Sequence, residues 1–198
     1  MRKPADLRRA EIIDAVLRLS VEVGPDRLGT PAVAVAVGIS QPAIFRHFPT
    51  REALWVAVAE HIAARMRAGW AEAEAGSPAP AERLRRVVEA QARLVAAEPS
   101  ILAIAFSHEL RVSNPALAAV FRGLMTELTG RLVTAFAAFG APLTTPPEDA
   151  ALLVLGLVQG LALRWSLSGR GFDLVAEAGR LLDLQLAGLL RAEPGFRP

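Results

Sequence analysis

The side chains best suited to specific chemistry lie together in residues 41–47, which read Gln-Pro-Ala-Ile-Phe-Arg-His. If this segment is a helix, five of its side chains have positions that can point outward, namely Gln41, Ala43, Phe45, Arg46 and His47. A glutamine amide can form two hydrogen bonds with the edge of adenine, and an alanine or a proline can contact the methyl group of thymine. The chemistry that this segment could perform is therefore recognition of double-stranded DNA.

The rest of the chain offers little that could carry out catalysis or bind a metal. The sequence contains no Gly-x-Ser-x-Gly, no phosphate-binding glycine loop and no His-Glu-x-x-His. His61 and His108 have no acidic residue or histidine partnered with them at a metal-ligand spacing. Because cysteine is absent, disulfides, cysteine nucleophiles and thiolate metal sites are excluded as well. We therefore predict that the protein is not an enzyme and holds no metal and no cofactor.

The composition of the 198 residues is that of a folded protein with a tendency to self-associate. Hydrophobic residues make up 53% and charged residues 21%, which is too apolar for a disordered chain. Such a chain can fill a core and leave apolar surface over. The net charge is only +2, so a basic surface must be local, and the start of the chain carries Arg2, Lys3, Arg8 and Arg9 against Asp6.

Two apolar features bear on the location of the protein. The N-terminus runs into a charged helix and has no apolar signal-peptide core. The most apolar run, from Ala150 to Leu163, is shorter than the roughly 20 residues that cross a bilayer. We therefore predict a cytoplasmic protein with no membrane partner.

The elements that position these side chains are predicted to be helices throughout. No stretch shows sustained period-two alternation, whereas apolar residues recur at helical spacing, as Leu54, Val58, Ile62 and Met66 do. Prolines that follow capping residues mark several helix starts. The predicted fold class is all-α, with about nine helices at residues 6–23, 30–37, 41–47, 51–75, 80–97, 99–111, 115–139, 147–167 and 174–191.

Two of these helices, 30–37 and 41–47, have the features of a helix-turn-helix. Thr30 is expected to cap the first helix, and Gly38 to end it in the left-handed conformation that glycine adopts at low cost. Ser40 is expected to cap the second helix. Ala34 and Ala36 are small enough for the second helix to cross close by. In this motif the N-terminal residues of the second helix contact base edges in the major groove.

One set of residues within positions 8–58 is specific as a combination. It comprises Gly24, Thr30, Val33-Ala34, Gly38-Ile39-Ser40, Phe45-Arg46-His47-Phe48 and Thr50-Arg51-Glu52-Ala53-Leu54. This combination resembles the DNA-binding domain of the TetR/AcrR family of bacterial transcriptional repressors. The resemblance implies an N-terminal three-helix helix-turn-helix domain at residues 1–52 and a C-terminal helical ligand-binding and dimerisation domain at residues 53–198. It also implies a nucleoid-associated bacterial protein, and a homodimer whose last two helices form a four-helix interface.

The resemblance also assigns roles to the residues of the motif. Those implied to face bases are Gln41, Pro42 and Ala43. Those implied to lie at the phosphate backbone are Thr30, Phe45, His47 and Arg51. Ser40 and Arg46 complete the predicted DNA-binding set.

The sequence departs from the usual pattern of the family at three points. Phe45 occupies a position that is usually tyrosine, whose hydroxyl reaches a phosphate, and Arg51 occupies one that is usually lysine. Pro31-Ala32 follow Thr30, where a polar or basic residue is usual. We therefore expect fewer phosphate contacts, for which the basic start of the chain could compensate.

The second domain contains candidates for a ligand pocket. Gln91 lies on the apolar stripe of its helix, where a buried amide must find hydrogen-bond partners. It could bond to a neighbouring backbone group, or it could be the polar anchor of an otherwise apolar ligand pocket. Phe106, Phe121 and Met125 could line the same pocket, or they could be plain core residues.

The helix that contains Ala150 to Leu163 is the best candidate for a dimer interface. A helix that is apolar on every side must be covered on both sides, by its own domain and by a partner subunit, unless it lies in a single crowded core. Glycines spaced four apart would let a second helix approach closely. The predicted interface residues are Leu153, Gly156, Gly160, Leu182, Leu186 and Leu189.

These observations predict a dimeric, sequence-specific DNA-binding transcriptional regulator. In this reading a repressor binds a palindromic operator and is released by a small, mainly apolar effector. One alternative is a DNA-binding adaptor or chromosome-organising protein whose second domain contacts a protein partner. Another is a helical enzyme or small-molecule carrier that does not bind DNA.

Overall fold

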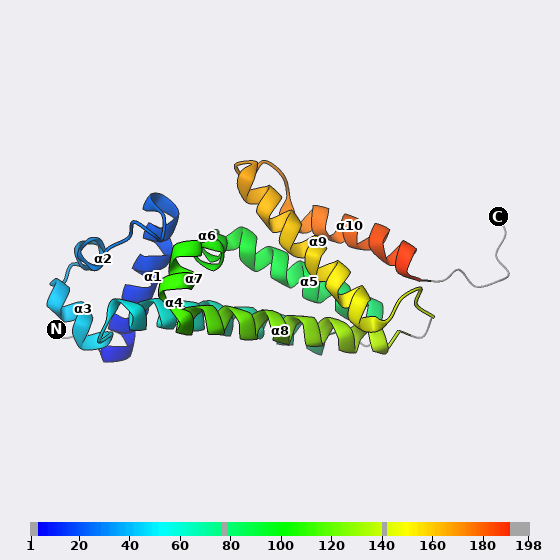
Figure 1. Ribbon diagram of the computed structural model, residues 1–198, viewed down its shortest axis with the longest axis horizontal. Helices are drawn as coiled ribbons and strands as arrows, with labels where there is room; N and C mark the ends of the chain where they lie inside the picture. Colours follow the sequence, from blue (N-terminus) through cyan, green and yellow to red (C-terminus); the bar gives the residue numbers. More distant parts are fainter. Residues whose placement is uncertain (1–3, 77–78, 140–141, 191–198) are drawn as a thin grey trace. The chain divides into compact units, whose positions relative to one another are not determined.

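The computed structural model describes residues 4–76, 79–139 and 142–190, which form ten helices (Figure 1). Their bounds are α1 Ala5–Val23, α2 Thr30–Val37, α3 Gln41–His47, α4 Arg51–Ala75, α5 Pro80–Ala97, α6 Ser100–Phe106, α7 His108–Ser113, α8 Pro115–Ala137, α9 Pro147–Leu167 and α10 Leu174–Leu189. Within these ranges no strand forms, and the β-type pairing is limited to an isolated bridge between Leu143 and Leu190. The predicted all-α fold is confirmed.

One predicted helix is in fact two helices. The segment 99–111 was expected to be continuous, but the chain breaks at Ser107, which adopts an extended conformation with φ −60° and ψ 115°. The Ser107 hydroxyl accepts a hydrogen bond from the backbone N–H of Leu110 at 3.0 Å and so caps α7. A serine without a neighbouring proline or glycine is a weak break signal, which is why the sequence pattern did not indicate it.

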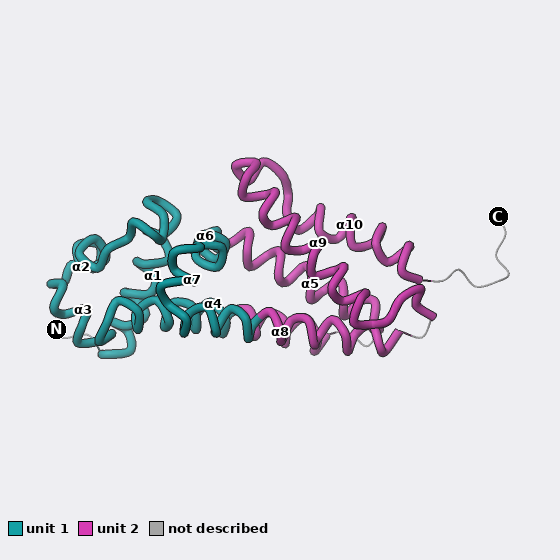
Figure 2. The backbone as a smooth tube through the Cα atoms, viewed as in Figure 1, with its two compact units in different colours: residues 1–65, 98–124 teal, residues 66–97, 125–198 magenta. Residues whose placement is uncertain are grey.

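The chain divides into two compact units (Figure 2). Unit 1 comprises residues 1–65 and 98–124, and unit 2 comprises residues 66–97 and 125–198. Helices α4 and α8 each contribute to both units. The functional division into residues 1–52 and 53–198 stays a prediction.

Unit 1 is built around α1, which packs against α2, α3 and α6, while α2 also packs against α3. Apolar residues at helical spacing turn one face of each helix inward. The core residues of this kind include Ile12, Val16, Val33, Ile44, Phe48, Leu54 and Val58. The two short helices of the motif are therefore held by a shared core rather than by their own length.

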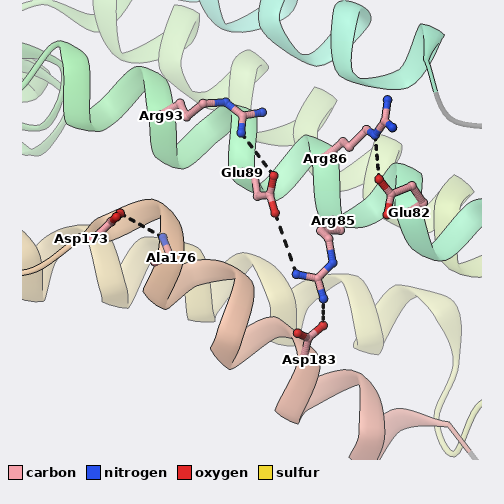
Figure 3. Close-up of polar contacts among 8 residues, drawn as sticks. All are labelled: Glu82, Arg85, Arg86, Glu89, Arg93, Asp173, Ala176 and Asp183. Atoms are coloured by element: carbon pink, nitrogen blue, oxygen red, sulfur yellow. Dashed lines mark hydrogen bonds and ion pairs between the residues drawn. The ribbon is translucent and has the colours of Figure 1, made fainter.

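In unit 2, α10 packs against α5 and α9. The buried residues of this unit include Trp70, Leu84, Val88, Leu132, Phe136, Val154 and Leu182. Figure 3 shows that Arg85 of α5 forms ion pairs with Glu89 of the same helix and with Asp183 of α10. At the start of α10 the Asp173 carboxylate accepts hydrogen bonds from the backbone N–H groups of Val175 and Ala176, at 2.9 and 3.0 Å. The cap stabilises the first turn of α10, and the ion pair with Asp183 joins α10 to α5.

Helix α9 is longer than the apolar run from Ala150 to Leu163, and this corrects the expectation that the segment is too short to cross a membrane. It has 21 residues and, by length and composition alone, it could cross a membrane. One such helix is weak evidence for a span, because core helices of other proteins meet the same test. Within unit 2 the helix contacts both α5 and α10, and one third of its most apolar stretch is buried.

Candidate nucleic-acid interface

The turn between α2 and α3 has the geometry that the glycine predicts. Gly38 adopts φ 70° and ψ 37°, a left-handed conformation that side-chain-bearing residues adopt only at a cost. The N–H of Ile39 donates to the carbonyl oxygen of Ala34 at 3.0 Å, which ends α2 with its last turn satisfied. Val33 and Ile44 are both buried, one from each helix, so the turn brings two apolar faces into one core.

Helix α3 presents a mixed polar and apolar face to solvent. Gln41, Pro42 and Arg46 are exposed, and Phe45 is 38% exposed. His47 is half-buried at the end of the helix. These five side chains are therefore accessible on the surface of unit 1, where the motif predicts contacts with DNA.

Ala43 does not belong to this accessible set. Its side chain is only 7% exposed, because it lies beside Ile44 on the face of α3 that packs into the core. The expectation that Ala43 faces bases is corrected on this ground. The small side chain instead lets α3 approach its neighbours closely.

Thr30 and Ser40 were expected to cap α2 and α3, but neither side chain makes a capping hydrogen bond. Gly29 is the residue that precedes α2, and Thr30 is the first residue inside the helix. Ser40 does precede α3 and is exposed, but its side chain makes no capping hydrogen bond. The Thr30 hydroxyl is used differently, because it accepts a hydrogen bond from the Nε2 of Gln41 at 2.9 Å.

Arg9 belongs to the basic start of the chain, and the structure gives it a contact with α3 that the sequence did not predict. Its guanidinium donates a hydrogen bond to the backbone carbonyl of His47 and lies 4.2 Å from the centre of the Phe48 ring. A cation at the C-terminal end of a helix compensates the carbonyl groups that have no partner there. Arg9 thereby fixes the end of α3 against α1, and the spacing of 38 residues left no local signal for this contact.

The basic start of the chain is partly engaged within the protein. Arg8 forms an ion pair with Glu11 at 2.9 Å, and Arg9 is bound as described above. Arg2 and Lys3 lie outside the described residues. Of the basic residues expected to compensate for missing phosphate contacts, two are therefore already paired.

The start of α4 lies directly after the motif and carries the predicted phosphate contact Arg51. Its guanidinium is half-buried and donates to the carbonyl of Leu28 at 3.5 Å. Thr50 caps the helix by accepting from the N–H of Ala53 at 3.0 Å. A hydrogen bond from its own backbone N–H and another from the Thr50 hydroxyl lower the pKa of the Glu52 carboxyl, so that this residue is charged beside Arg51.

Two hydrogen bonds join the α6–α8 segment of unit 1 to the motif. Asn114 donates from Nδ2 to the carbonyl of Glu52 at 3.0 Å, and its Oδ1 accepts from the N–H of Leu117, which caps α8. The Ser107 hydroxyl donates to the carboxylate of Asp26, in the loop between α1 and α2. Each of the two residues caps the helix that follows it, and the fold gives each a second, distant partner.

The candidate ligand-pocket residues are divided between the units. Phe106, which is 47% exposed, and Phe121, which is buried, belong to unit 1. Gln91 and Met125 belong to unit 2. Gln91 is buried, and its Oε1 accepts a hydrogen bond from the indole N–H of Trp70 at 3.0 Å. Its acceptor is thus used within the protein, by a side chain rather than by a backbone group.

Replacing Gln91 with Leu is expected to destabilise the protein, because the buried N–H of Trp70 would lose its acceptor. A buried donor left without a partner costs about 1–3 kcal/mol, which corresponds to several degrees in melting temperature for a chain of this size. Thermal unfolding followed by circular dichroism measures the loss. The double variant Trp70→Phe with Gln91→Leu removes both polar groups. Its melting temperature is expected to fall by less than the sum of the decreases in the two single variants. Strict additivity would contradict the pairing.

Unit 2 also has a groove of about 640 Å³ between α4 and α5. Six of its eleven lining residues are charged, and the ion pairs of Arg86 with Glu82 and of Arg93 with Glu89 lie along it (Figure 3). None of the four candidate pocket residues lines it. This groove therefore differs in chemistry from the apolar pocket that the sequence analysis predicts.

The predicted dimer residues fall into two groups. Leu153, Gly156 and Gly160 of α9 are exposed on the single chain. Leu182 and Leu189 of α10 are buried in unit 2, and Leu186 is half-buried. Leu182 and Leu189 are therefore core residues of their own chain, because α10 turns this face toward its contacts with α5 and α9.

Comparison with known proteins agrees with the helix-turn-helix geometry. The sequence pattern of bacterial regulatory proteins of the tetR family matches residues 12–58. The HTH-type transcriptional regulator BetI of Burkholderia thailandensis is 31% identical over 190 residues, which cover 92% of this chain and 95% of that protein. The tetracycline repressor protein class D of Escherichia coli is 43% identical over 61 residues, 31% of this chain and 28% of that protein.

The fold is also shared with solved structures. The transcriptional regulator FadR of Bacillus subtilis, in complex with stearoyl-CoA, superposes with a TM-score of 0.75 at 20% identity. The match covers 91% of this chain and 98% of that one. The similarity therefore extends over both units of the chain and is not confined to the helix-turn-helix.

Proposed function

The chain belongs to the TetR family of bacterial transcriptional regulators, and we propose that it is a dimeric, cytoplasmic repressor that binds a palindromic operator. In this proposal α3 enters the major groove, Gln41 and Pro42 contact bases, and Phe45, His47 and Arg51 lie at the phosphate backbone. A small, mainly apolar effector releases the operator. The protein acts by binding and not by catalysis.

The observation that carries the proposal is the accessible face of α3. Gln41 and Arg46 are exposed there on a helix whose other face is anchored by the buried Ile44. The contact of Arg9 with the His47 carbonyl holds the far end of the same helix. A short helix that is fixed at its end and along one face can present side chains to base edges at little entropic cost.

The exposed face of α9 supports the dimer. Leu152, Gly156, Gly160, Leu163 and Leu167 recur at helical spacing and form one exposed stripe, in which Leu167 is 79% exposed. No atom outside the helix lies within 4 Å of a Cβ added at either glycine, so this part of the stripe is open on the single chain. We infer that the α9 stripe of one protomer packs on the partner, with the exposed residues of α10 beside it.

Effector release requires a connection between ligand binding and α3. We infer that α4 provides it, because this helix of 25 residues begins at Arg51, directly after the motif, and its residues 66–75 belong to unit 2. The hydrogen bonds of Asn114 and Ser107 offer a second route from α6–α8 to the motif. A ligand shifts the equilibrium only if it binds the state that cannot bind DNA more tightly. The solved structure of FadR of Bacillus subtilis is a complex with stearoyl-CoA, which supports an apolar effector in this proposal.

The experiment that tests the proposed function is selection of bound sequences from random duplex DNA at two salt concentrations. We expect a palindromic consensus with half-sites about one helical turn or more apart. We also expect affinity to fall steeply as salt increases, because phosphate contacts release counterions. Weak binding without any consensus would contradict sequence-specific regulation. A very large number of genomic sites would instead favour the chromosome-organising alternative.

Replacing Arg51 with Ala is expected to weaken binding to all duplexes alike, because a phosphate contact carries no sequence information. For one contact per protomer, the slope of log affinity against log salt should become shallower by about 2 for the dimer. Fluorescence anisotropy with the selected operator over a salt series measures this slope. Arg51→Lys keeps the charge and serves as the control. A lower melting temperature with an unchanged salt slope would show that Arg51 acts only through its contact with Leu28.

A further inference from the structure

The side chains at the starts of the two motif helices are joined directly. Thr30 is the first residue of α2 and Gln41 is the first residue of α3. The Nε2 of Gln41 donates a hydrogen bond to the Oγ1 of Thr30 at 2.9 Å. Thr30 is 8% exposed, whereas Gln41 is exposed, so a buried hydroxyl holds the amide of a surface side chain.

The Gln41 amide keeps the atoms that it needs to bind a base while it is bonded to Thr30. A glutamine side chain has one carbonyl oxygen and two N–H hydrogens. A bidentate contact with adenine uses the oxygen and one of these hydrogens. The second hydrogen suffices for the bond to Thr30, so the same amide can bind Thr30 and a base at once.

The contact with Thr30 also restricts the conformations of the Gln41 side chain. A free glutamine has several rotatable bonds, and ordering such a side chain at an interface costs free energy that is lost from binding. Thr30 is β-branched and therefore stiff, and it is buried. A stiff, buried acceptor can hold the amide before DNA arrives.

We propose that Thr30 is a positioning residue for Gln41 and that it sets sequence preference without touching a base. The inference rests on the proposed function, in which Gln41 contacts a base pair. It differs from the phosphate contact that the family resemblance implies for Thr30. The Thr30 hydroxyl accepts the bond from Gln41 and still has its own hydrogen to donate to a phosphate. Loss of a phosphate contact would weaken binding to every duplex, whereas loss of the positioning role would reduce sequence preference.

The test compares Thr30→Val, which keeps the shape but removes the acceptor, with Thr30→Ser, which keeps the hydroxyl. Anisotropy titrations use the selected operator and a duplex changed at the base pair whose preference is lost in Gln41→Ala. We expect Thr30→Val to reduce the preference between these duplexes about two- to tenfold per half-site, the equivalent of ordering one flexible side chain. Thr30→Ser is expected to preserve most of the preference. In a Gln41→Ala background, Thr30→Val should change the preference no further.

Each other outcome has a defined meaning. If Thr30→Val weakens binding to both duplexes equally and leaves the preference unchanged, Thr30 is a phosphate contact and the inference is overturned. If valine at this position prevents folding, Thr30→Ala gives the same comparison with a smaller side chain that fits any helix. If the parent protein selects no consensus, the proposed function fails and the inference falls with it. A parent that selects a consensus which Thr30→Val retains in full contradicts the inference alone.

Discussion

Gly156→Leu is expected to convert the dimer into folded monomers and to abolish operator binding at concentrations where the parent binds. Gly156 is exposed and nothing outside the helix lies within 4 Å of a Cβ added there, so a side chain starts in open space on the single chain. In the proposed dimer the same side chain would hold two closely packed helices apart. Overpacking costs about 1–3 kcal/mol per site, and the symmetric interface contains the site twice. The dissociation constant of the dimer should therefore rise about 30-fold to 20,000-fold.

Sedimentation velocity over a concentration series measures this change, and circular dichroism confirms that the helices persist. Gly130→Leu is the matched control, because Gly130 is also an exposed helical glycine of unit 2 with nothing within 4 Å of an added Cβ. It lies on α8, which the proposal does not place in the interface, and should leave the dimer intact. A Gly156→Leu protein that remains dimeric and binds the operator normally would remove the α9 stripe from the interface.

Gln41→Ala is expected to relax sequence preference at one position of each half-site while leaving the affinity for unrelated duplexes nearly unchanged. A bidentate contact contributes about 1–3 kcal/mol of discrimination per base pair. Because a dimer reads the position twice, the preference for the operator over a duplex changed in both half-sites should fall about 30-fold to 20,000-fold. The salt slope should stay the same, since the amide carries no charge.

Competition titrations between the two duplexes give this ratio directly, and repeating the selection with the variant identifies the position. Ser113→Ala serves as the control, because it removes an exposed hydroxyl from α7 of the same unit, where it bonds only to the carbonyl of Glu109 in its own helix. An unaltered consensus for Gln41→Ala would show that α3 does not read DNA through this residue.

The positions of the motif helices were predictable because their signals are local. The expected ranges 30–37 and 41–47 coincide with α2 and α3. Pro31 and Pro42 suit only the first turn of a helix, and Gly38 readily adopts the left-handed turn that ends one. The break at Ser107 escaped prediction because a serine without a neighbouring proline or glycine is a weak break signal, and its hydrogen-bond partner Asp26 is 81 residues away.

Helical periodicity predicts which stripe of a helix is apolar but not how much of that stripe a neighbour covers. Ala43 was expected at the DNA and is buried, because the core of unit 1 extends one position further around α3 than the motif suggested. Leu182 and Leu189 were expected at the dimer interface and are buried in unit 2, because α5 and α9 already cover that face of α10. Burial of this kind depends on where the other helices lie.

By itself, the sequence determined the all-α fold, the bounds of the helix-turn-helix and the side chains that could recognise DNA. These follow from backbone preferences and apolar spacing within a few neighbouring residues. Only the tertiary structure decided that Thr30 holds Gln41, that Arg9 binds the carbonyl of His47 and that Asn114 binds the carbonyl of Glu52. The partners are 11, 38 and 62 residues apart. Such contacts exist only when the assembled core brings the two elements together, and no local pattern encodes that arrangement.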